Sequence, residues 1–298
     1  MRAPVPGGSG SGARRRRAPL VAVLAAALAT AALVAAALVA AALVAAVLAV
    51  GTRTASRDAD GSGGVVRLRA RVLEVLRHDP KAYTQGLEAR GGRLYESTGR
   101  FGKSTVAVGA PGEPPAVRVR LPAEFFGEGL TVVGRRVWQL TWRNGVAVER
   151  DARTLREIRR VRYPGEGWGI CYQPEYDRLV TSDGSAWLTH RDPRTLAATG
   201  RVRVVEPGGG PVRSLNELEC VGDGVYANVF GRHRIVRVDG DSGRVTADID
   251  ASGLLEPGEH GGVLNGIAAL PGGEEFLLTG KDWPKMFRVR FDAVAAGG

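Results

Sequence analysis

The chain of 298 residues contains only two cysteines, Cys171 and Cys220, and four histidines. Two cysteines cannot build the disulfide framework of a small secreted domain, and without a CxxC pair they do not form a structural zinc site. The histidines lie far apart and include no HExxH pattern, so we expect them at turns or on the surface. The sequence therefore predicts no bound metal and no cofactor.

Positive charge is abundant, but it lacks the arrangement that nucleic acids require. The formal net charge is +10, and five arginines, at position 2 and positions 14–17, precede a long apolar segment. The remaining Lys and Arg residues form no stripe interleaved with aromatic residues, which make up 6% of the chain. No zinc-finger or helix-turn-helix spacing occurs either. This pattern argues against a nucleic-acid partner.

Charged residues are absent from residues 18–50, which are mostly Ala, Val and Leu. A run of about 33 residues of this kind exceeds the core of a signal peptide and is long enough to cross a bilayer. The basic residues 1–17 predict that the N-terminus stays in the cytoplasm. We therefore expect a transmembrane signal-anchor helix, with signal cleavage and secretion as the alternative.

Residues 51–64 are polar and rich in glycine, which is typical of a flexible linker. A single-pass anchor in the cell membrane would place the domain beyond it, residues 65–298, on the outer side. The chain would then have four parts, namely a basic N-terminus, an anchor, a linker and one folded domain.

No segment after Val66 shows a convincing helical period. Short apolar runs alternate with clusters of Gly, Pro, Asp and Asn, which is typical of an all-β domain. Five segments begin alike, at intervals close to the period of about 40–50 residues that four-stranded propeller blades show. These segments are QGLEARGGRLYESTG from Gln85, EGLTVVGRRVWQLTW from Glu128, WGICYQPEYDRLVTSDG from Trp168, NELECVGDGVYANVF from Asn216 and NGIAALPGGEEFLLTGK from Asn265. They predict a five-bladed β-propeller.

The segment before the first repeat alternates apolar and charged residues from Val66 to Val72, as a half-buried strand does. We expect this strand to pair with the last repeat, near residues 286–291, because such a closure leaves fewer free sheet edges.

Equivalent positions in the five repeats define a ring of side chains around the predicted channel. The first strand of a blade lines the channel, so the residue before each apolar run should lie at one mouth. These residues are Gln85, Glu128, Trp168, Asn216 and Asn265. The second strands end near the same mouth with Trp142, Phe230 and Lys281. Such polar groups can simply bond one another, but one carboxylate, one lysine, carboxamides and indoles together favour a binding site.

At these motifs the sequence resembles the plant-type, metal-independent glutaminyl-peptide cyclotransferases, which are five-bladed propellers. The matching stretches are HDPKAYTQGLE, YESTG, FGEGLT, QLTWRNG, YPGEGWG, SDGS, LNELE, YANVF, VLNGIA and TGKDWPK. They occur in all five repeats and in the same order, between about Val72 and Phe291. The resemblance implies an aminoacyltransferase that converts the N-terminal glutamine of a peptide or protein substrate to pyroglutamate and releases ammonia.

The resemblance also implies roles for individual residues. Glu128 matches the essential glutamate of the family, and Asn216 and Lys281 match its active-site asparagine and lysine. One carboxyl group can act first as general base and then as general acid, which fits Glu128. A raised pKa in apolar surroundings would suit this task.

Substrate binding is expected from the aromatic and amide side chains that surround Glu128. Gln85 can contact the substrate carboxamide, and Trp142 and Trp168 can form apolar walls. Phe230 stands where the family tends to carry tryptophan, so the indole N–H donor is lost there. The remaining candidates are Tyr83 and Asn265. Glu166, in the second GEG motif, is expected to support the site from its rim.

Alternatives remain open at this point. A membrane-tethered propeller that binds a peptide or small ligand without turnover would share the fold, because fold does not imply function. A calcium-dependent propeller hydrolase would need more carboxylates in the ring. Cys171 and Cys220 lie on the first strands of neighbouring repeats and can either form a disulfide or remain free thiols.

Overall fold

The computed structural model describes residues 64–294. The expected basic N-terminus, transmembrane helix and nearly all of the expected linker lie outside the described residues. Within 64–294 no helix is long and apolar enough to span a membrane.

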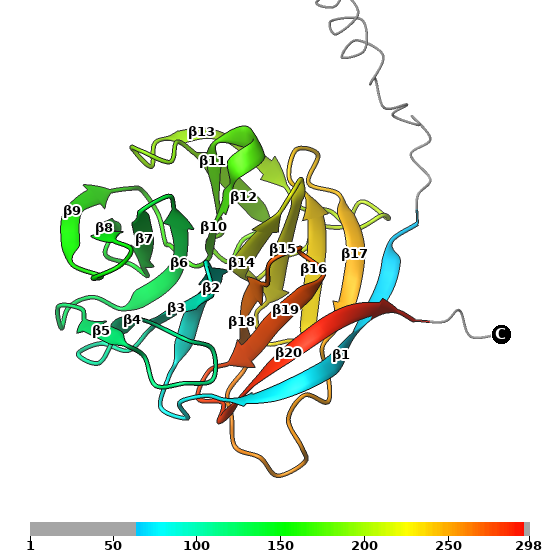
Figure 1. The fold of residues 1–298 in the computed structure, drawn as a ribbon. Helices are drawn as coiled ribbons and strands as arrows, with labels where there is room; N and C mark the ends of the chain where they lie inside the picture. The colour runs from blue at the N-terminus through cyan, green and yellow to red at the C-terminus, as the bar shows by residue number, and fades with distance from the viewer. Residues whose placement is uncertain (1–63, 295–298) are drawn as a thin grey trace, which may run out of the picture. The chain divides into compact units, whose positions relative to one another are not determined.

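The described residues form an all-β unit with a propeller-like arrangement (Figure 1). Three sheets have four antiparallel strands each. They consist of β2 (Thr84–Arg90), β3 (Arg93–Thr98), β4 (Thr105–Gly109) and β5 (Val117–Arg120); β6 (Gly127–Val133), β7 (Arg136–Thr141), β8 (Val146–Asp151) and β9 (Glu157–Arg162); and β10 (Ile170–Gln173), β11 (Arg178–Thr181), β12 (Trp187–Arg191) and β13 (Ala198–Arg203). A 3-10 turn, η1 (Pro174–Tyr176), joins β10 to β11.

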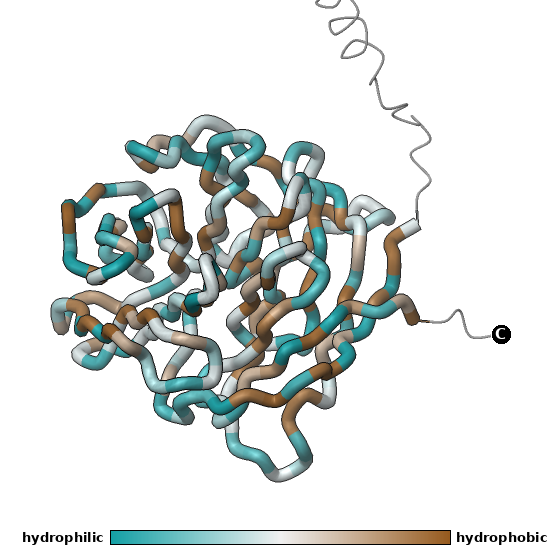
Figure 2. Tube along the Cα trace, in the orientation of Figure 1, coloured by the Kyte–Doolittle hydropathy of each residue, from teal (hydrophilic) through white to brown (hydrophobic). Residues whose placement is uncertain are grey.

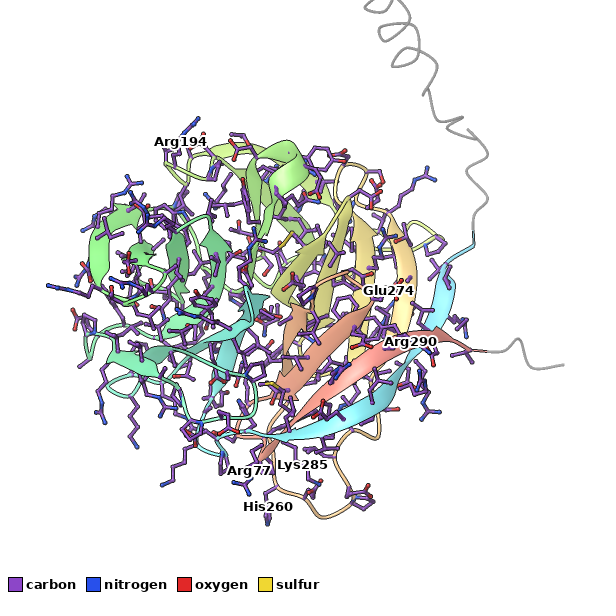
Figure 3. The ribbon with its side chains drawn as sticks, in the orientation of Figure 1. Arg77, Arg194, His260, Glu274, Lys285 and Arg290 are labelled. Atoms are coloured by element: carbon purple, nitrogen blue, oxygen red, sulfur yellow. A yellow bond between two sulfur atoms is a disulfide. The ribbon has the colours of Figure 1, made fainter. Side chains whose placement is uncertain are left out.

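The fourth sheet has eight strands in the order β14-β15-β16-β17-β1-β20-β19-β18. Its members are β14 (Leu215–Val221), β15 (Gly224–Val229), β16 (Arg234–Asp239), β17 (Val245–Asp250), β1 (Val66–Arg77), β20 (Lys285–Ala293), β19 (Glu275–Gly280) and β18 (Leu264–Ala269). The strand β1 pairs with β20 in antiparallel fashion, and the ladder ends at Arg77 opposite Lys285 (Figure 3). The predicted closure by the N-terminal strand is therefore confirmed. The sequence did not reveal that β1 also pairs in parallel with β17, which joins two repeats into one sheet.

The first strands of the repeats occupy the centre of the unit. They pack against one another in the cyclic order β2, β6, β10, β14, β18 and back to β2, and Figure 1 shows them around the middle of the described unit. Their burial differs from that of the outer strands: β6 is buried at almost every position, whereas β9 is exposed at most positions. Figure 2 shows apolar and hydrophilic residues interspersed along the chain over short stretches.

Close approach of the first strands explains the glycines that recur in them. A Cβ on Gly129 would come within 2.6 Å of the Trp168 carbonyl oxygen, and a Cβ on Gly127 within 2.6 Å of the Thr98 carbonyl oxygen. Glycines on both sides of Glu128 therefore let β6 lie against its neighbours, and the glutamate is the first side chain available at this end of the strand.

The two cysteines form a disulfide between Cys171 on β10 and Cys220 on β14, with 5.5 Å between their Cα atoms. This bond resolves the alternative left open by the sequence. It crosslinks neighbouring repeats beside a core cluster that includes Val180, Leu188 and Val225.

Candidate functional site

The five ring residues occupy the places that the repeat alignment predicts. Gln85, Glu128, Asn216 and Asn265 are each the second residue of a first strand, and Trp168 lies two residues before β10. The four polar members are buried, with at most 5% of each residue exposed. Because the first strands are adjacent, one end of the central bundle gathers these side chains.

A chain of hydrogen bonds leads across this ring to Glu128. Asn265 Nδ2 donates to Gln85 Oε1 at 3.2 Å, and Gln85 Nε2 donates to Glu128 Oε1 at 3.1 Å. Asn265 Nδ2 also donates to the Thr84 carbonyl oxygen at 3.1 Å. Both ends of the Gln85 carboxamide are thus engaged within the protein. This geometry suits Gln85 to orient Glu128, whereas the sequence suggested that Gln85 contacts the substrate.

Lys281 approaches the site from the end of β19. Its residue is 4% exposed, and Nζ lies 4.8 Å from the Tyr83 ring centroid and 5.0 Å from the Phe230 ring centroid. The ammonium therefore sits between two aromatic rings, an arrangement that stabilises a desolvated cation. No ion pair joins Lys281 to Glu128 within residues 64–294, so the ammonium acts on this carboxylate through space.

Glu166 holds the two predicted tryptophan walls together. Its Oε2 accepts hydrogen bonds from Trp142 Nε1 at 2.8 Å and from Trp168 Nε1 at 3.0 Å. Its Oε1 accepts from Arg143 Nε at 2.8 Å, and the Arg143 guanidinium lies 3.9 Å from the Trp142 ring centroid. The expected supporting role of Glu166 thus takes a specific form, because one carboxylate fixes both indoles.

Aromatic contacts continue on both sides of this bridge. We call the following five side chains the aromatic cluster: Tyr83, Phe126, Trp142, Trp168 and Phe230. Phe126 lies 6.3 Å from Tyr83 and 5.5 Å from Trp142 between ring centroids, and Trp168 lies 5.8 Å from Phe230. Glu166 links the two tryptophans through hydrogen bonds, and the Lys281 ammonium lies near both Phe230 and Tyr83. Contacts therefore run without interruption around the cluster.

Burial and nearby charges shift the pKa values of the ionisable groups. Burial raises the pKa of Glu128 well above its ordinary value; Lys281 opposes this effect and Glu166 adds to it. Burial lowers the pKa of Lys281 to about 8, against the attraction of Glu128 and Asp282. Burial alone would raise the pKa of Glu166, but hydrogen bonds from Trp168, Arg143 and Trp142 lower it. The site thus contains one carboxyl with a raised pKa, one lysine with a lowered pKa and one carboxylate whose pKa is lowered by its hydrogen bonds.

Three carboxamides near the ring carry a buried atom without a hydrogen-bond partner. These atoms are Asn216 Oδ1, Asn228 Nδ2 and Asn265 Oδ1. Leaving a buried polar atom unpaired is costly unless a ligand or water satisfies it. Asn216 was predicted as an active-site residue. Asn228, whose Oδ1 accepts from the Gly266 N–H at 3.1 Å, was expected near the mouth, at the end of its second strand, but was not among the predicted site residues.

Phe126 was not predicted as a member of the aromatic cluster, although it begins the FGEGLT motif that contains Glu128. His78 lies in the connection between β1 and β2, as expected for a residue at a turn, but its side chain is enclosed, with Nε2 2.9 Å from Glu96 Oε1. It borders a cavity of about 580 Å³ that Leu94 and Met286 also line, away from Glu128.

Comparisons with known proteins identify the family to which the chain belongs. The family model described as glutamine cyclotransferase matches residues 41–291. A glutaminyl-peptide cyclotransferase of Arabidopsis thaliana is 34% identical over 248 residues, which cover 79% of this chain and 77% of the plant protein.

A solved structure gives the same result. The crystal structure of Myxococcus xanthus glutaminyl cyclase is similar with a TM-score of 0.70 and 37% sequence identity, and the match covers 77% of this chain and 99% of that chain. The family match spans most of the sequence, and the ring residues come from all five repeats. The chain therefore belongs to the glutamine cyclotransferase family.

Proposed function

We propose that this protein is a glutaminyl-peptide cyclotransferase that converts N-terminal glutamine to pyroglutamate and releases ammonia. The observation that carries the proposal is the buried Glu128, which is oriented by Gln85 and faces the Lys281 ammonium inside the aromatic cluster. Membership of the glutamine cyclotransferase family supports the same activity.

In the proposed reaction, the α-amino nitrogen of the substrate attacks the carbon of its own side-chain carboxamide. The new C–N bond closes a five-membered ring, and the carbonyl π electrons move to oxygen. Because both reacting groups belong to one residue, the enzyme gains most by holding a conformation in which they are already close. The indoles fixed by Glu166 are suited to hold the glutamine side chain in this way.

Proton transfer is the proposed task of Glu128. The carboxylate accepts the proton that the attacking nitrogen loses and delivers it to the departing amide nitrogen, so that ammonia leaves as the carbonyl re-forms. A general base works best when its pKa approaches the working pH. Burial moves the pKa of the Glu128 carboxyl in this direction, and the Lys281 ammonium opposes the effect and favours the carboxylate form.

Stabilisation of the developing oxyanion is the proposed task of Lys281, with Asn216 nearby to bind the substrate's amine or amide hydrogens. A preorganised donor has its greatest effect where water is excluded. The buried position of Lys281 and the unpaired Oδ1 of Asn216 support this division of roles.

We further propose that the fold is a five-bladed β-propeller. The cyclic packing of β2, β6, β10, β14 and β18 supports it, since each of these strands begins one repeat. In this interpretation the eight-stranded sheet is two blades joined through β1.

The apolar residues 18–50 are proposed to anchor the enzyme in the cell membrane with the catalytic unit outside; the length of this segment and the arginines before it support the proposal. Separation of membranes from the soluble fraction checks it: the full chain should sediment with membranes, and a chain lacking residues 1–63 should not. Equal distribution of the two chains would refute the anchor.

Ammonia release from synthetic peptides tests the function. The full-length chain in detergent should release one ammonia per peptide from N-terminal glutaminyl peptides, with the matching mass loss, and should leave N-acetylglutaminyl peptides unchanged because their amine is blocked. A chelator is expected to leave the rate unchanged. Folded protein that binds these peptides without releasing ammonia would instead support the non-catalytic binding propeller.

A further inference from the structure

Exposed aromatic side chains are concentrated beside the aromatic cluster. Within residues 64–294 the large aromatic side chains that are exposed are Phe101, Tyr176 and Phe230, and Phe101 is exposed to 58%. Phe230 belongs to the cluster. Phe101 contacts it, because its ring lies edge-on to Phe126 with 5.4 Å between centroids. An exposed phenylalanine that extends an active site outward is a candidate for substrate contact.

The turn that carries Phe101 is held by hydrogen bonds at both ends. Ser104 Oγ donates to the Arg100 carbonyl oxygen at 2.8 Å and accepts from the Arg100 N–H at 2.9 Å. Ser104 Oγ also accepts from the Gly127 N–H at 3.0 Å. The Gly102 N–H donates to the Ala123 carbonyl oxygen at 2.9 Å. The exposure of Phe101 is therefore a fixed feature, and the turn is tied to the residue that precedes Glu128.

The charged side chains on either side of this aromatic surface are paired. Arg100 Nη2 donates to Asp282 Oδ2 at 2.6 Å, and the guanidinium lies 4.7 Å from the Tyr83 ring centroid. On the other side, Arg143 binds Glu166. Since Arg100 and Arg143 are already paired, they do not favour a charged substrate side chain on the surface between them.

The stereochemistry of the substrate indicates what reaches this surface. The attacking α-amine must lie beside Glu128, and the α-carbon that bears it also bears the carbonyl that continues to the second residue. The second residue must therefore leave the site on the Glu128 side. Phe126 lies two residues before Glu128 along the chain, and Phe101 lies outward of Phe126.

We propose that Phe101 and Phe126 form a subsite for the side chain of the second residue of the substrate, and that this subsite prefers aromatic and large aliphatic residues. The inference rests on the proposed cyclotransferase function and adds the class of peptide that the enzyme takes best. Phe101 acts here as a specificity-determining residue and takes no part in proton transfer.

Steady-state turnover of four matched peptides tests the subsite. The full-length chain would be compared with Phe101→Ala and Phe101→Leu on peptides that begin Gln-Phe, Gln-Leu, Gln-Gly and Gln-Glu. The wild type should show a kcat/KM for Gln-Phe about tenfold above that for Gln-Gly, because one aromatic contact contributes this order of selectivity. Phe101→Ala should bring the ratio of kcat/KM for Gln-Phe to kcat/KM for Gln-Gly close to one and should change kcat/KM for Gln-Gly little. Phe101→Leu should retain most of the wild-type ratio.

A control variant removes another exposed apolar side chain. Ile158 on β9 is exposed to 47%, so Ile158→Ala should leave all four rates unchanged. A Gln-Phe to Gln-Gly ratio of kcat/KM near one in the wild type, or a ratio unaffected by Phe101→Ala, would refute the proposed subsite. A preference for Gln-Glu would also refute it and would point to Lys103, which is exposed on the same turn.

Calorimetric binding of the products separates this inference from the proposed function. Pyroglutamyl-phenylalanine should bind about tenfold more tightly than pyroglutamyl-glycine, and Phe101→Ala should remove the difference. Absence of ammonia from every peptide would refute the cyclotransferase function, while the binding difference would still decide whether the subsite exists.

Discussion

Glu128 and Glu217 are both buried carboxylates near the beginning of a first strand, and they occupy adjacent positions of the same repeat pattern. Glu128 stands at the ring position of its repeat. Glu217 stands one residue later, where the other four repeats have glycine. The residues are 5% and 0% exposed, and burial raises the pKa of both well above the ordinary value.

The two carboxylates differ in what satisfies them. Glu217 Oε1 accepts from the Leu87 N–H at 3.2 Å, and Oε2 accepts from the Ile267 N–H at 2.9 Å. It therefore ties β14 to the first strands of two other repeats. Glu128 accepts from the side-chain carboxamide of Gln85 and interacts with Lys281 beside the aromatic cluster. Burial and a raised pKa alone thus do not identify a catalytic acid; the partners distinguish a crosslink from a proton carrier.

Apart from the loss of Glu128 itself, the largest effect is expected from Lys281→Met. Loss of one preorganised charge at the oxyanion should lower kcat about 100-fold. In the wild type, kcat/KM should fall as the pH rises above about 8, where Lys281 loses its proton, and the variant should lack this alkaline decline.

The acidic limb of the pH profile of kcat/KM should also shift in Lys281→Met. Lys281 lowers the pKa of Glu128, so its removal should raise that pKa and shift the acid limb to higher pH. Measuring both enzymes with one peptide cancels the titration of the substrate amine. An unchanged profile would show that Lys281 does not interact with the proton carrier.

Glu217→Ala should separate stability from activity. The substitution leaves the buried Leu87 and Ile267 N–H groups without acceptors, which should lower the free energy of unfolding by about 3 kcal/mol. Thermal unfolding followed by circular dichroism measures this loss. Turnover per folded molecule should remain within about twofold of the wild type, and a large loss of turnover with unchanged stability would remove the distinction between the two glutamates.

Glu166→Gln should affect substrate binding more than chemistry. A carboxamide cannot accept from both indoles and from Arg143 with the strength of a carboxylate, so the walls lose part of their fixed geometry. We expect KM to rise about fivefold with kcat nearly unchanged, given the cost of one charge-assisted hydrogen bond. Glu157→Gln, which alters a surface pair with Arg160, is the matched control and should change neither constant. A fall in kcat alone would instead place Glu166 in proton transfer.

The smallest effect is expected from Phe230→Trp. The larger ring strengthens the contact with the Lys281 ammonium and adds an indole N–H beside Trp168. KM for glutaminyl peptides should fall about threefold, by the size of one such contact. Steady-state kinetics measures it, and a rise in KM would mean that phenylalanine is the better fit to this site.

The sequence predicted the all-β class, the five strand starts and the closing strand, because these follow from local alternation and from the repeat. The ring of Gln85, Glu128, Trp168, Asn216 and Asn265 followed from the same alignment. What could not be predicted depends on how neighbouring sheets face one another. The bridge of Glu166 between two indoles is of this kind, since its partners lie in two different repeats.

Glu217 illustrates the same limit. Its carboxylate accepts from the amides of strands in two other repeats, and spacing within its own repeat does not reveal these partners. The pairing of Cys171 with Cys220 also depends on the rotation between adjacent sheets. Spacing within one repeat does not encode that rotation, so the disulfide stayed open until the structure placed the two residues together.

The contrast between the two glutamates is tested most directly by measuring Glu128→Gln and Glu217→Gln side by side, each for ammonia release from one N-terminal glutaminyl peptide and for thermal unfolding. Glu128→Gln should lose about 1,000-fold in kcat, within the range for general acid–base catalysis, and should unfold at or above the wild-type temperature. Glu217→Gln should keep its kcat and unfold at a lower temperature. Turnover that survives in Glu128→Gln, or that disappears in Glu217→Gln while the protein stays folded, would contradict the account.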